Sequence, residues 1–405
     1  MKLLIVDDDP VARSLSVRFL QIWGYEVVEA SDGAEALEIL DREPIQFVIS
    51  DWIMPNLSGL DVCRKIRMKE SAYYTYIILC TAKADKKAFI EGMEAGADDF
   101  LVKPFEKAEL HVRVRAGERI VNLEQGLAQR NRDLVGLNAK LLEAHRQIES
   151  DLQAAAWMQA SLLPKPSACI LGISSEWRFR PSRYVAGDTL NIFPIDEHHV
   201  AFYILDVSGH GVPAAMLSVM LGTLLTPDNT RENPLKQYDE IAQRYVPVAP
   251  EVAVAELNRR FQSREDQYFT MIYGLLDTRD LVLRFCQAGH PHPLLLSGGS
   301  VVQAVGEGGP PVGILPMAEY ESVQVQLKPG DRFLMYSDGV TECTNPCGEL
   351  FGDSRMQASL ARSCTQPLCE MFDGLELQME NWRGKREFED DISLLAIEVP
   401  EKETI

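Results

Sequence analysis

Short apolar runs alternate with helical segments over residues 1–115. The runs are Leu3–Val6, Phe47–Ser50, Ile77–Cys80 and Phe100–Val102, and polar or turn-forming residues follow each of them. Strands that alternate with helices pair in parallel and are covered by helices on both faces. The pattern therefore predicts a doubly wound α/β domain.

Beyond Pro166 the pattern changes, because extended apolar runs outnumber helical segments. The extended runs are Val200–Leu205, Phe269–Leu276, Leu281–Cys286, Pro293–Leu296, Arg332–Tyr336 and Ile392–Val399, and the helical segments are Pro213–Leu225, Val252–Gln262 and Ser354–Ala361. Many antiparallel-type strands with few helices predict an α+β sandwich. The polar stretch Pro227–Gln237 is expected to be an insertion or a flexible flap.

One helical pattern, from Ile120 to about Leu163, connects the two regions. Its apolar residues recur at intervals of three and four, or their sum, at Leu123, Leu127, Leu134, Leu137, Leu141 and Ile148. Such a seam is typical of a parallel coiled coil that dimerises the chain, and the alternative is an amphipathic helix packed on its own domains. The pattern divides the chain into domains at residues 1–118, 119–163 and 164–400.

Composition limits the classes of partner. The net charge of −20 disfavours binding to nucleic acid or to an anionic membrane. The eight cysteines lack the spacing of zinc ligands and suit a reducing compartment. No apolar stretch approaches the roughly 18 residues of a membrane span, and the first apolar run is too short for a signal peptide. We therefore expect a cytoplasmic protein.

The predicted parallel strands end in residues that suit phosphoryl chemistry. These residues are Asp7 and Asp8, Asp51, Thr81 and Lys103. The carboxyl ends of parallel strands lie at one edge of a sheet, so the side chains should converge. Three carboxylates that converge repel one another and require a divalent cation, and Mg²⁺ suits such oxygen ligands. A nearby lysine and hydroxyl can hold phosphoryl oxygens. The set predicts an aspartyl-phosphate site.

These residues, with Met54–Gly59, closely resemble the receiver domain of bacterial two-component response regulators, over roughly residues 1–118. The resemblance implies a flavodoxin-like fold and a sensor histidine kinase or phosphotransfer protein as partner. It makes Asp51 the phosphoacceptor, and Asp7 and Asp8 the acidic pair that binds Mg²⁺ together with Asp51. Thr81 and Lys103 are then the switch hydroxyl and the phosphate-sensing lysine, and Phe100 takes the aromatic switch position.

A second set of carboxylates lies at turns of the carboxyl-terminal region. Its members are Asp188, Asp206, Asp338 and the pair Asp390 and Asp391, each placed where an apolar run meets a turn. Carboxylates without histidine or cysteine favour hard ions such as Mn²⁺ or Mg²⁺. Two such ions about 3.5–4 Å apart activate water for phosphate-ester hydrolysis.

The acidic turns, with Gln287–Pro293 and Asn345–Gly352, resemble the metal-dependent serine/threonine protein phosphatases (PPM), especially the bacterial sporulation and general-stress branch. The resemblance implies two Mn²⁺ or Mg²⁺ ions. Asp206 would bridge them, followed by the carbonyl of Val207 as a further ligand. Asp338 and Asp390 would complete the coordination of one ion, and Asp188 would hold the other ion through the water molecules bound to it. Asp391 would orient its neighbour or bind an extra ion.

The sequence also departs from the pattern of this branch. Ala186 replaces a glycine, and Asn191 replaces an acid, which we expect to remove a charge near the cluster. His210 either donates a proton to the leaving group or is a solvated loop residue. His290 and His292, flanked by prolines, are expected to be structural.

The combined interpretation is a response regulator whose phosphorylation at Asp51 controls a protein phosphatase. In the branch that the chain resembles, the usual substrate is a phosphorylated anti-sigma-factor antagonist, and transcription changes indirectly. The alternative is a non-enzymatic adaptor that binds a sigma factor or another regulatory partner. Degenerate domains of that kind lose their metal carboxylates, whereas this chain retains Asp188, Asp206, Asp338 and Asp390.

Overall fold

The structure is a computed structural model that describes residues 1–69, 71, 73–82, 86–230, 232–262, 267–297 and 301–401. The chain divides into two compact units, Met1–His145 and Arg146–Ile405. No helix within these described ranges is both long and apolar enough to cross a membrane.

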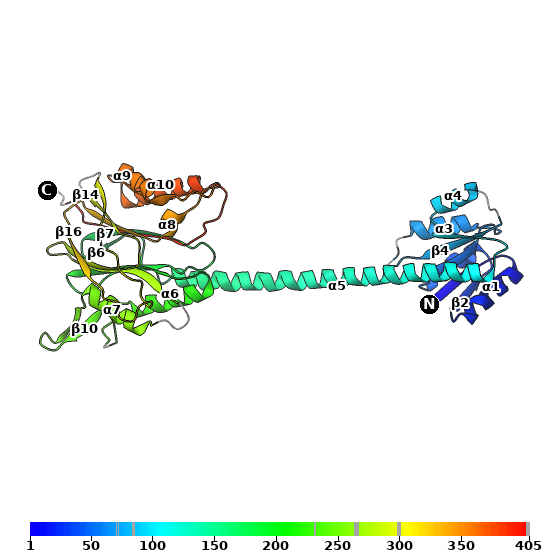
Figure 1. Ribbon diagram of the computed structural model, residues 1–405, viewed down its shortest axis with the longest axis horizontal. Helices are drawn as coiled ribbons and strands as arrows, with labels where there is room; N and C mark the ends of the chain where they lie inside the picture. The colour runs from blue at the N-terminus through cyan, green and yellow to red at the C-terminus, as the bar shows by residue number, and fades with distance from the viewer. Residues whose placement is uncertain are drawn as a thin grey trace. The chain divides into compact units, whose positions relative to one another are not determined.

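The first unit is a five-stranded parallel sheet in the order β2-β1-β3-β4-β5, as expected for the flavodoxin-like fold. Helix α1 and the start of α5 cover one face, whereas α2, α3 and α4 cover the other (Figure 1). The elements are β1 Lys2–Val6, α1 Pro10–Ile22, β2 Glu26–Ala30, α2 Gly33–Arg42, β3 Phe47–Asp51, α3 Gly59–Met68, β4 Tyr76–Thr81, α4 Lys86–Glu94, β5 Asp99–Val102 and α5 Lys107–Ala160.

Strand β2 is the one strand of this sheet that the sequence pattern did not predict. It is an edge strand with the sequence Glu26-Val-Val-Glu-Ala30, and its exposed glutamates break the apolar run. Strand order places β1 between β2 and β3, so the chain reverses direction across the sheet between β1 and β3. Ligands of open α/β sheets bind at such a switch point, and this is where Asp7 and Asp51 lie.

Helix α5 contains the predicted connector and is longer than expected. It begins at Lys107 because its first turns pack on the sheet of the first unit through Leu110, Val114 and Val121. The side chains of the predicted seam remain in solvent: Leu137 is 65% exposed and Leu141 is 66% exposed. Within the described residues of this single chain, therefore, nothing covers the seam.

The second unit contains two antiparallel sheets. One has the strand order β16-β13-β12-β9-β8, and the other has the order β15-β14-β17-β18-β7-β6. Their strands are β6 Ala168–Ile170, β7 Ile173–Arg180, β8 Thr189–Pro194, β9 His199–Val207, β12 Phe269–Asp277, β13 Val282–Ala288, β14 Leu294–Ser297, β15 Val301–Ala304, β16 Ser322–Gln326, β17 Arg332–Tyr336 and β18 Ile392–Glu398. The helices are α6 Val212–Leu224, α7 Pro250–Arg260, α8 Gly339–Glu342, α9 Gly352–Ser363 and α10 Leu368–Arg383.

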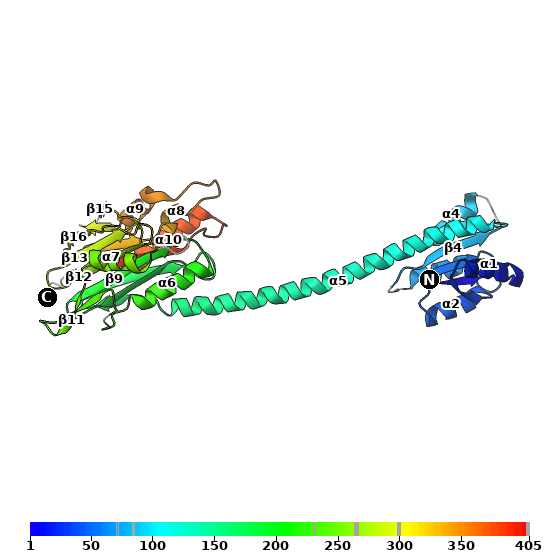
Figure 2. The same cartoon turned by 60° about the horizontal axis from the view of Figure 1, so that its bottom comes forward.

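These sheets face each other across a core that includes Phe202, Phe285 and Phe333. Helices α6 and α7 cover the outside of one sheet, and α9 and α10 cover the outside of the other (Figure 1). The predicted α+β sandwich is thus confirmed. The end of α5 lies alongside α6 in both views (Figures 1 and 2).

The predicted flap, residues 227–237, leads into a hairpin of β10 Lys236–Asp239 and β11 Arg244–Pro247. Its described part is held by hydrogen bonds rather than left loose. Asn233 Nδ2 donates to the carbonyls of Thr226 and Asp228, at 2.8 and 2.6 Å, and Lys236 Nζ donates to that of Pro227 at 2.8 Å. Residue 231 lies outside the described residues.

Candidate functional site

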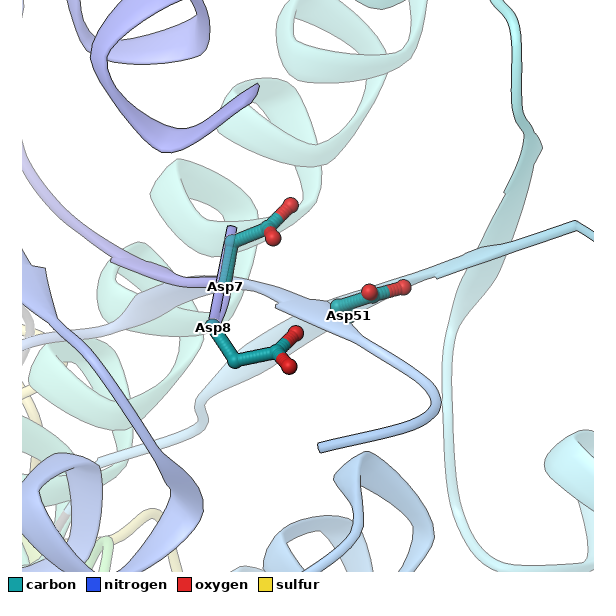
Figure 3. Close-up of side chains that lie close together, drawn as sticks. All are labelled: Asp7, Asp8 and Asp51. Carbon is teal, nitrogen blue, oxygen red and sulfur yellow. The ribbon is translucent and has the colours of Figure 1, made fainter. Parts of the chain in front are cut away.

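The first unit brings three carboxylates together at the carboxyl ends of β1 and β3 (Figure 3). Asp7, Asp8 and Asp51 each place one oxygen within 4.8 Å of the others. Asp7 is buried, Asp51 is half-buried and Asp8 is exposed. Three oxygen ligands with one open side suit a hydrated divalent cation, and the choice of Mg²⁺ stays a prediction.

Lys103 supplies the positive charge of this site. Its Nζ lies 2.7 Å from Asp7 Oδ2 and 3.0 Å from Asp51 Oδ2. Burial raises the pKa of Asp51, and the ammonium of Lys103 opposes that shift. A cavity of 390 Å³ opens beside these groups, lined on its apolar side by Leu15 and Phe19.

The two predicted switch residues lie next to this site. Thr81 ends β4 one residue beyond Cys80, which pairs with Asp51, and it is buried. Phe100 on β5 is also buried, and its ring packs 5.8 Å from that of Trp52, the residue after Asp51. The switch roles of Thr81 and Phe100 stay predictions.

The second set of carboxylates comes from both sheets of the sandwich. Asp188 precedes β8 and Asp206 is the penultimate residue of β9, which pairs with β8. Asp338 follows β17, and Asp390 precedes β18, which pairs with β17. Leu205 and Val207 face the core beneath α6, so the alternation of the strand turns Asp206 toward the facing sheet.

Two glycines let these turns approach each other. A Cβ atom on Gly187 would meet the Val207 carbonyl at 3.0 Å and Asp206 Oδ1 at 3.6 Å. A Cβ atom on Gly339 would overlap the carbonyl oxygen of Asp391. The residue next to Asp188 therefore lies against Asp206, and the residue next to Asp338 lies against the Asp390–Asp391 turn.

The carboxylates repel one another strongly enough to shift their pKa values. Burial raises the pKa of Asp206 to about 7, and the charges of Asp338 and Asp390 add to this effect. Burial also raises the pKa of Asp188 well above its usual range, and the charge of Asp206 reinforces it. Such a cluster is stabilised only when protons or cations neutralise it.

A cation fits this cluster, because its donor set is rich in carboxylate and an acceptor oxygen is left over. Asp188 is 1% exposed, and its Oδ2 atom is buried without a hydrogen-bond partner among the described residues. The cluster is wider than the receiver site: within the described chain, no three of its members place oxygens within 4.8 Å of one another.

Asp391 is engaged differently from its neighbour Asp390. Its Oδ1 accepts the backbone N–H of Ser182 and its Oδ2 accepts that of Gly187, both at 2.7 Å. The carboxylate of Asp391 therefore fixes the loop that carries Asp188. These bonds hold the loop before Asp188 rather than Asp390, and the two predicted roles of Asp391, orienting Asp390 or binding an extra ion, stay predictions.

The departure at Asn191 lies away from the carboxylates. Asn191 pairs across the strands with Tyr203, whose hydroxyl it contacts in the core beneath α6. Its Oδ1 accepts the backbone N–H of Ile192 at 2.8 Å. The expected loss of a charge near the cluster is therefore not what this substitution causes here. Burial raises the pKa of Asp390, and the exposed His210 opposes this shift, so His210 lies near the rim of the cluster.

Gln159, near the end of α5, is a residue of the site region that the sequence did not single out. It is 4% exposed, and its Nε2 donates to the Ala186 carbonyl at 2.7 Å and to Ser218 Oγ at 2.9 Å. Its Oε1 accepts the Ala186 N–H at 3.0 Å. Nothing in the periodicity distinguishes it from the exposed Gln153 on the same helix.

Comparisons with known proteins agree with this geometry. A family model described as Stage II sporulation protein E (SpoIIE) matches residues 196–400, just over half of the chain. A model described as Response regulator receiver domain matches residues 3–115.

Two relatives match the first unit. "Probable transcriptional regulator ycf27" of Porphyridium aerugineum is 44% identical over 121 residues, which are 30% of this chain and 49% of that protein. The protein of the same name in Guillardia theta is 45% identical over 121 residues, 30% of this chain and 46% of that protein. The chain thus spans about half the length of these curated relatives.

The second unit resembles a solved structure, the "SiaA-PP2C domain of Pseudomonas aeruginosa". The TM-score is 0.53 at 21% identity, covering 63% of this chain and 98% of that one. This likeness shows the fold. The two family matches establish that the chain belongs to the Stage II sporulation protein E (SpoIIE) family and carries a response regulator receiver domain at its N-terminal end.

Proposed function

We propose that this chain is a response regulator whose output is a metal-dependent serine/threonine protein phosphatase. The observation that carries the proposal is the carboxylate cluster between the two sheets, with the pKa of Asp206 raised and a buried oxygen of Asp188 left without a partner among the described residues. Such a cluster is costly to fold unless cations bind it.

In this proposal, Asp206, the Val207 carbonyl, Asp338, Asp390 and Asp188 would together hold two Mn²⁺ or Mg²⁺ ions. When bound, the ions supply an activated water and neutralise phosphoryl oxygens. Asp391 orients the loop of Asp188 through its two backbone hydrogen bonds. His210, exposed near Asp390, would be the residue that donates a proton to the leaving group.

We propose that Asp51 accepts a phosphoryl group from a sensor histidine kinase or phosphotransfer protein. Mg²⁺ at Asp7, Asp8 and Asp51 would bind the phosphoryl oxygens. Lys103 already contacts two of these carboxylates, and it would pair with the added negative charge. Thr81 would hydrogen-bond the phosphoryl group, and the ring of Phe100 would change position when Thr81 moves.

Control would pass through α5, because this helix begins on the receiver sheet and carries Gln159 in its last turn. We further propose that its exposed leucine seam pairs with a second copy of the chain. An exposed apolar stripe on a helix of 54 residues is stabilised by such pairing. Re-pairing of the two helices could then bias the loop that carries Asp188.

The proposed substrate is a phosphorylated anti-sigma-factor antagonist, as in the branch that the sequence resembles. The adaptor alternative is not favoured, because an adaptor has no need of the repelling carboxylates at Asp188, Asp206 and Asp338. The test is the rate of Mn²⁺-dependent dephosphorylation of such antagonists by the parent chain and by Asp206→Asn. Loss of turnover in Asp206→Asn with substrate binding intact supports the enzyme, and binding without any turnover in the parent supports the adaptor.

A further inference from the structure

His290 is a buried histidine that the proposed mechanism does not use. It follows β13, is 3% exposed and lies at the edge of the sandwich. Its Nδ1 atom lies 2.8 Å from Thr270 Oγ1 on β12. Its backbone carbonyl accepts a hydrogen bond from Gln287 Nε2 at 2.6 Å, so the main chain of this turn is held as well.

Thr270 connects His290 to the carboxylate cluster. In the antiparallel pair of β9 and β12, Thr270 is the direct cross-strand partner of Asp206. Opposite residues of an antiparallel pair point to the same face of the sheet, with Cβ atoms about 4.5–5.5 Å apart. The side chains of Thr270 and Asp206 are therefore neighbours on the same face of this sheet.

The other side of the imidazole faces the opposite sheet. The backbone carbonyl of Tyr336, two residues before Asp338, opposes the lowering of the pKa of His290. Within the described chain, Nε2 makes no hydrogen bond of normal geometry. A carbonyl can only accept, so it favours the proton on Nε2 and leaves Nδ1 to accept the hydroxyl proton of Thr270. Burial lowers the pKa of His290 to about 3, so the ring is neutral at physiological pH.

We infer that His290 is a positioning residue for the metal centre: its hydrogen bond to Thr270 orients the residue that pairs with Asp206 across the strands. The inference rests on the proposed function, because it assumes that these carboxylates bind Mn²⁺. The exposed His292, two residues further and also beside a proline, has no such contacts among the described residues. It supplies a matched control.

The test measures Mn²⁺ binding to the full chain by calorimetry. Asp206→Asn identifies which binding step belongs to this centre, because the receiver also takes a divalent ion. His290→Ala is expected to weaken that step by on the order of 10-fold, as loss of an outer-shell hydrogen bond does. His290→Asn retains an atom at the Nδ1 position and should stay within about 3-fold of the parent, and His292→Ala should be unchanged.

Thr270→Val and the double variant His290→Ala/Thr270→Val complete the series. Because His290→Ala and Thr270→Val break the same hydrogen bond, the double variant should bind Mn²⁺ no more weakly than the worse single variant. Additive losses, equal damage by His290→Asn and His290→Ala, or parental affinity in folded His290→Ala would each overturn the inference. If His290→Ala does not fold, the Mn²⁺ affinities of Thr270→Val and Thr270→Ser are compared instead, because only Thr270→Val removes the hydroxyl. A parent that binds Mn²⁺ at this centre but shows no turnover would refute the phosphatase and leave the inference intact.

Discussion

The side chain of Gln159 and the backbone of Ala186 are joined by two hydrogen bonds, from Nε2 to the carbonyl oxygen at 2.7 Å and from the backbone N–H to Oε1 at 3.0 Å. Ala186 is two residues before Asp188. The last turns of α5 are thus tied directly to the loop that carries a proposed metal residue. A displacement of the helix must either move that loop or break a buried pair of hydrogen bonds.

The first prediction concerns this connection. Gln159→Ala leaves the N–H of Ala186 buried and unpaired, while the Ala186 carbonyl keeps the hydrogen bond from Ser218 Oγ at 3.2 Å. The unpaired N–H destabilises this arrangement of the loop by roughly 1–3 kcal/mol. We expect phosphatase activity to become independent of receiver phosphorylation. The measurement is the rate of antagonist dephosphorylation with and without a small-molecule phosphodonor. Gln153→Ala, at an exposed site on the same helix, should respond as the parent does; an unchanged response in Gln159→Ala would exclude this route of control.

The second prediction separates the neighbours Asp390 and Asp391. Asp390→Asn relieves repulsion in the cluster, so the metal-free protein should become more stable while Mn²⁺-dependent activity falls. Asp391→Asn can keep only one of two backbone hydrogen bonds, so it should lower stability by about 1–3 kcal/mol. Denaturant unfolding with a chelator present measures both changes. Shifts of the same sign would contradict the assignment of different roles.

The third prediction follows from the raised pKa of Asp206, which is about 7 in the folded chain. An unfolded aspartate has a pKa of about 3.9, so between these values the folded state holds the proton more tightly. That stabilisation is lost as pH rises through 7. Without metal, the stability that Asp206→Asn gains over the parent should therefore grow by roughly 1 kcal/mol between pH 6 and pH 8. Saturating Mn²⁺ should abolish this trend, and a pH-independent difference without metal would contradict it.

The fourth prediction concerns the seam of α5. Leu137→Asp places a charge in the proposed helix pair, whereas Ala139→Asp places the same charge on the opposite side of the helix. We expect the first variant to be monomeric and the second to remain dimeric in sedimentation equilibrium. A parent that is monomeric at micromolar concentration would instead support a helix that acts within one chain.

Sequence periodicity predicted the strands with uninterrupted apolar runs and missed those without them. Strand β17 begins and ends at the predicted residues Arg332 and Tyr336 because it is buried throughout. Strand β16, Ser322–Gln326, was missed because it is an edge strand with alternating exposed residues. Helix α10 was missed as well, although five of its residues are buried.

The residues of the candidate site could likewise be predicted only in part. Acidic residues at strand ends were predictable because such ends carry ligands, and Asp7, Asp8 and Asp51 do lie together. The partners of Gln159 and Asp391 could not be predicted, since each bond joins segments far apart in sequence, 27 residues for Gln159 to Ala186 and 204 for Asp391 to Gly187. The contacts of a single polar side chain leave no periodic pattern in the sequence, so only the tertiary structure reveals them.

The most direct test of the account compares Mn²⁺-dependent dephosphorylation of a phosphorylated anti-sigma-factor antagonist with and without a phosphodonor, in the parent chain and in Asp51→Asn. Asp51→Asn removes the proposed phosphoacceptor but leaves the carboxylates of the second unit untouched. We predict that the phosphodonor changes the rate of the parent several-fold and leaves that of Asp51→Asn unchanged. Equal rates in the parent, with Asp51 shown by mass spectrometry to be phosphorylated, would contradict control of the phosphatase by the receiver.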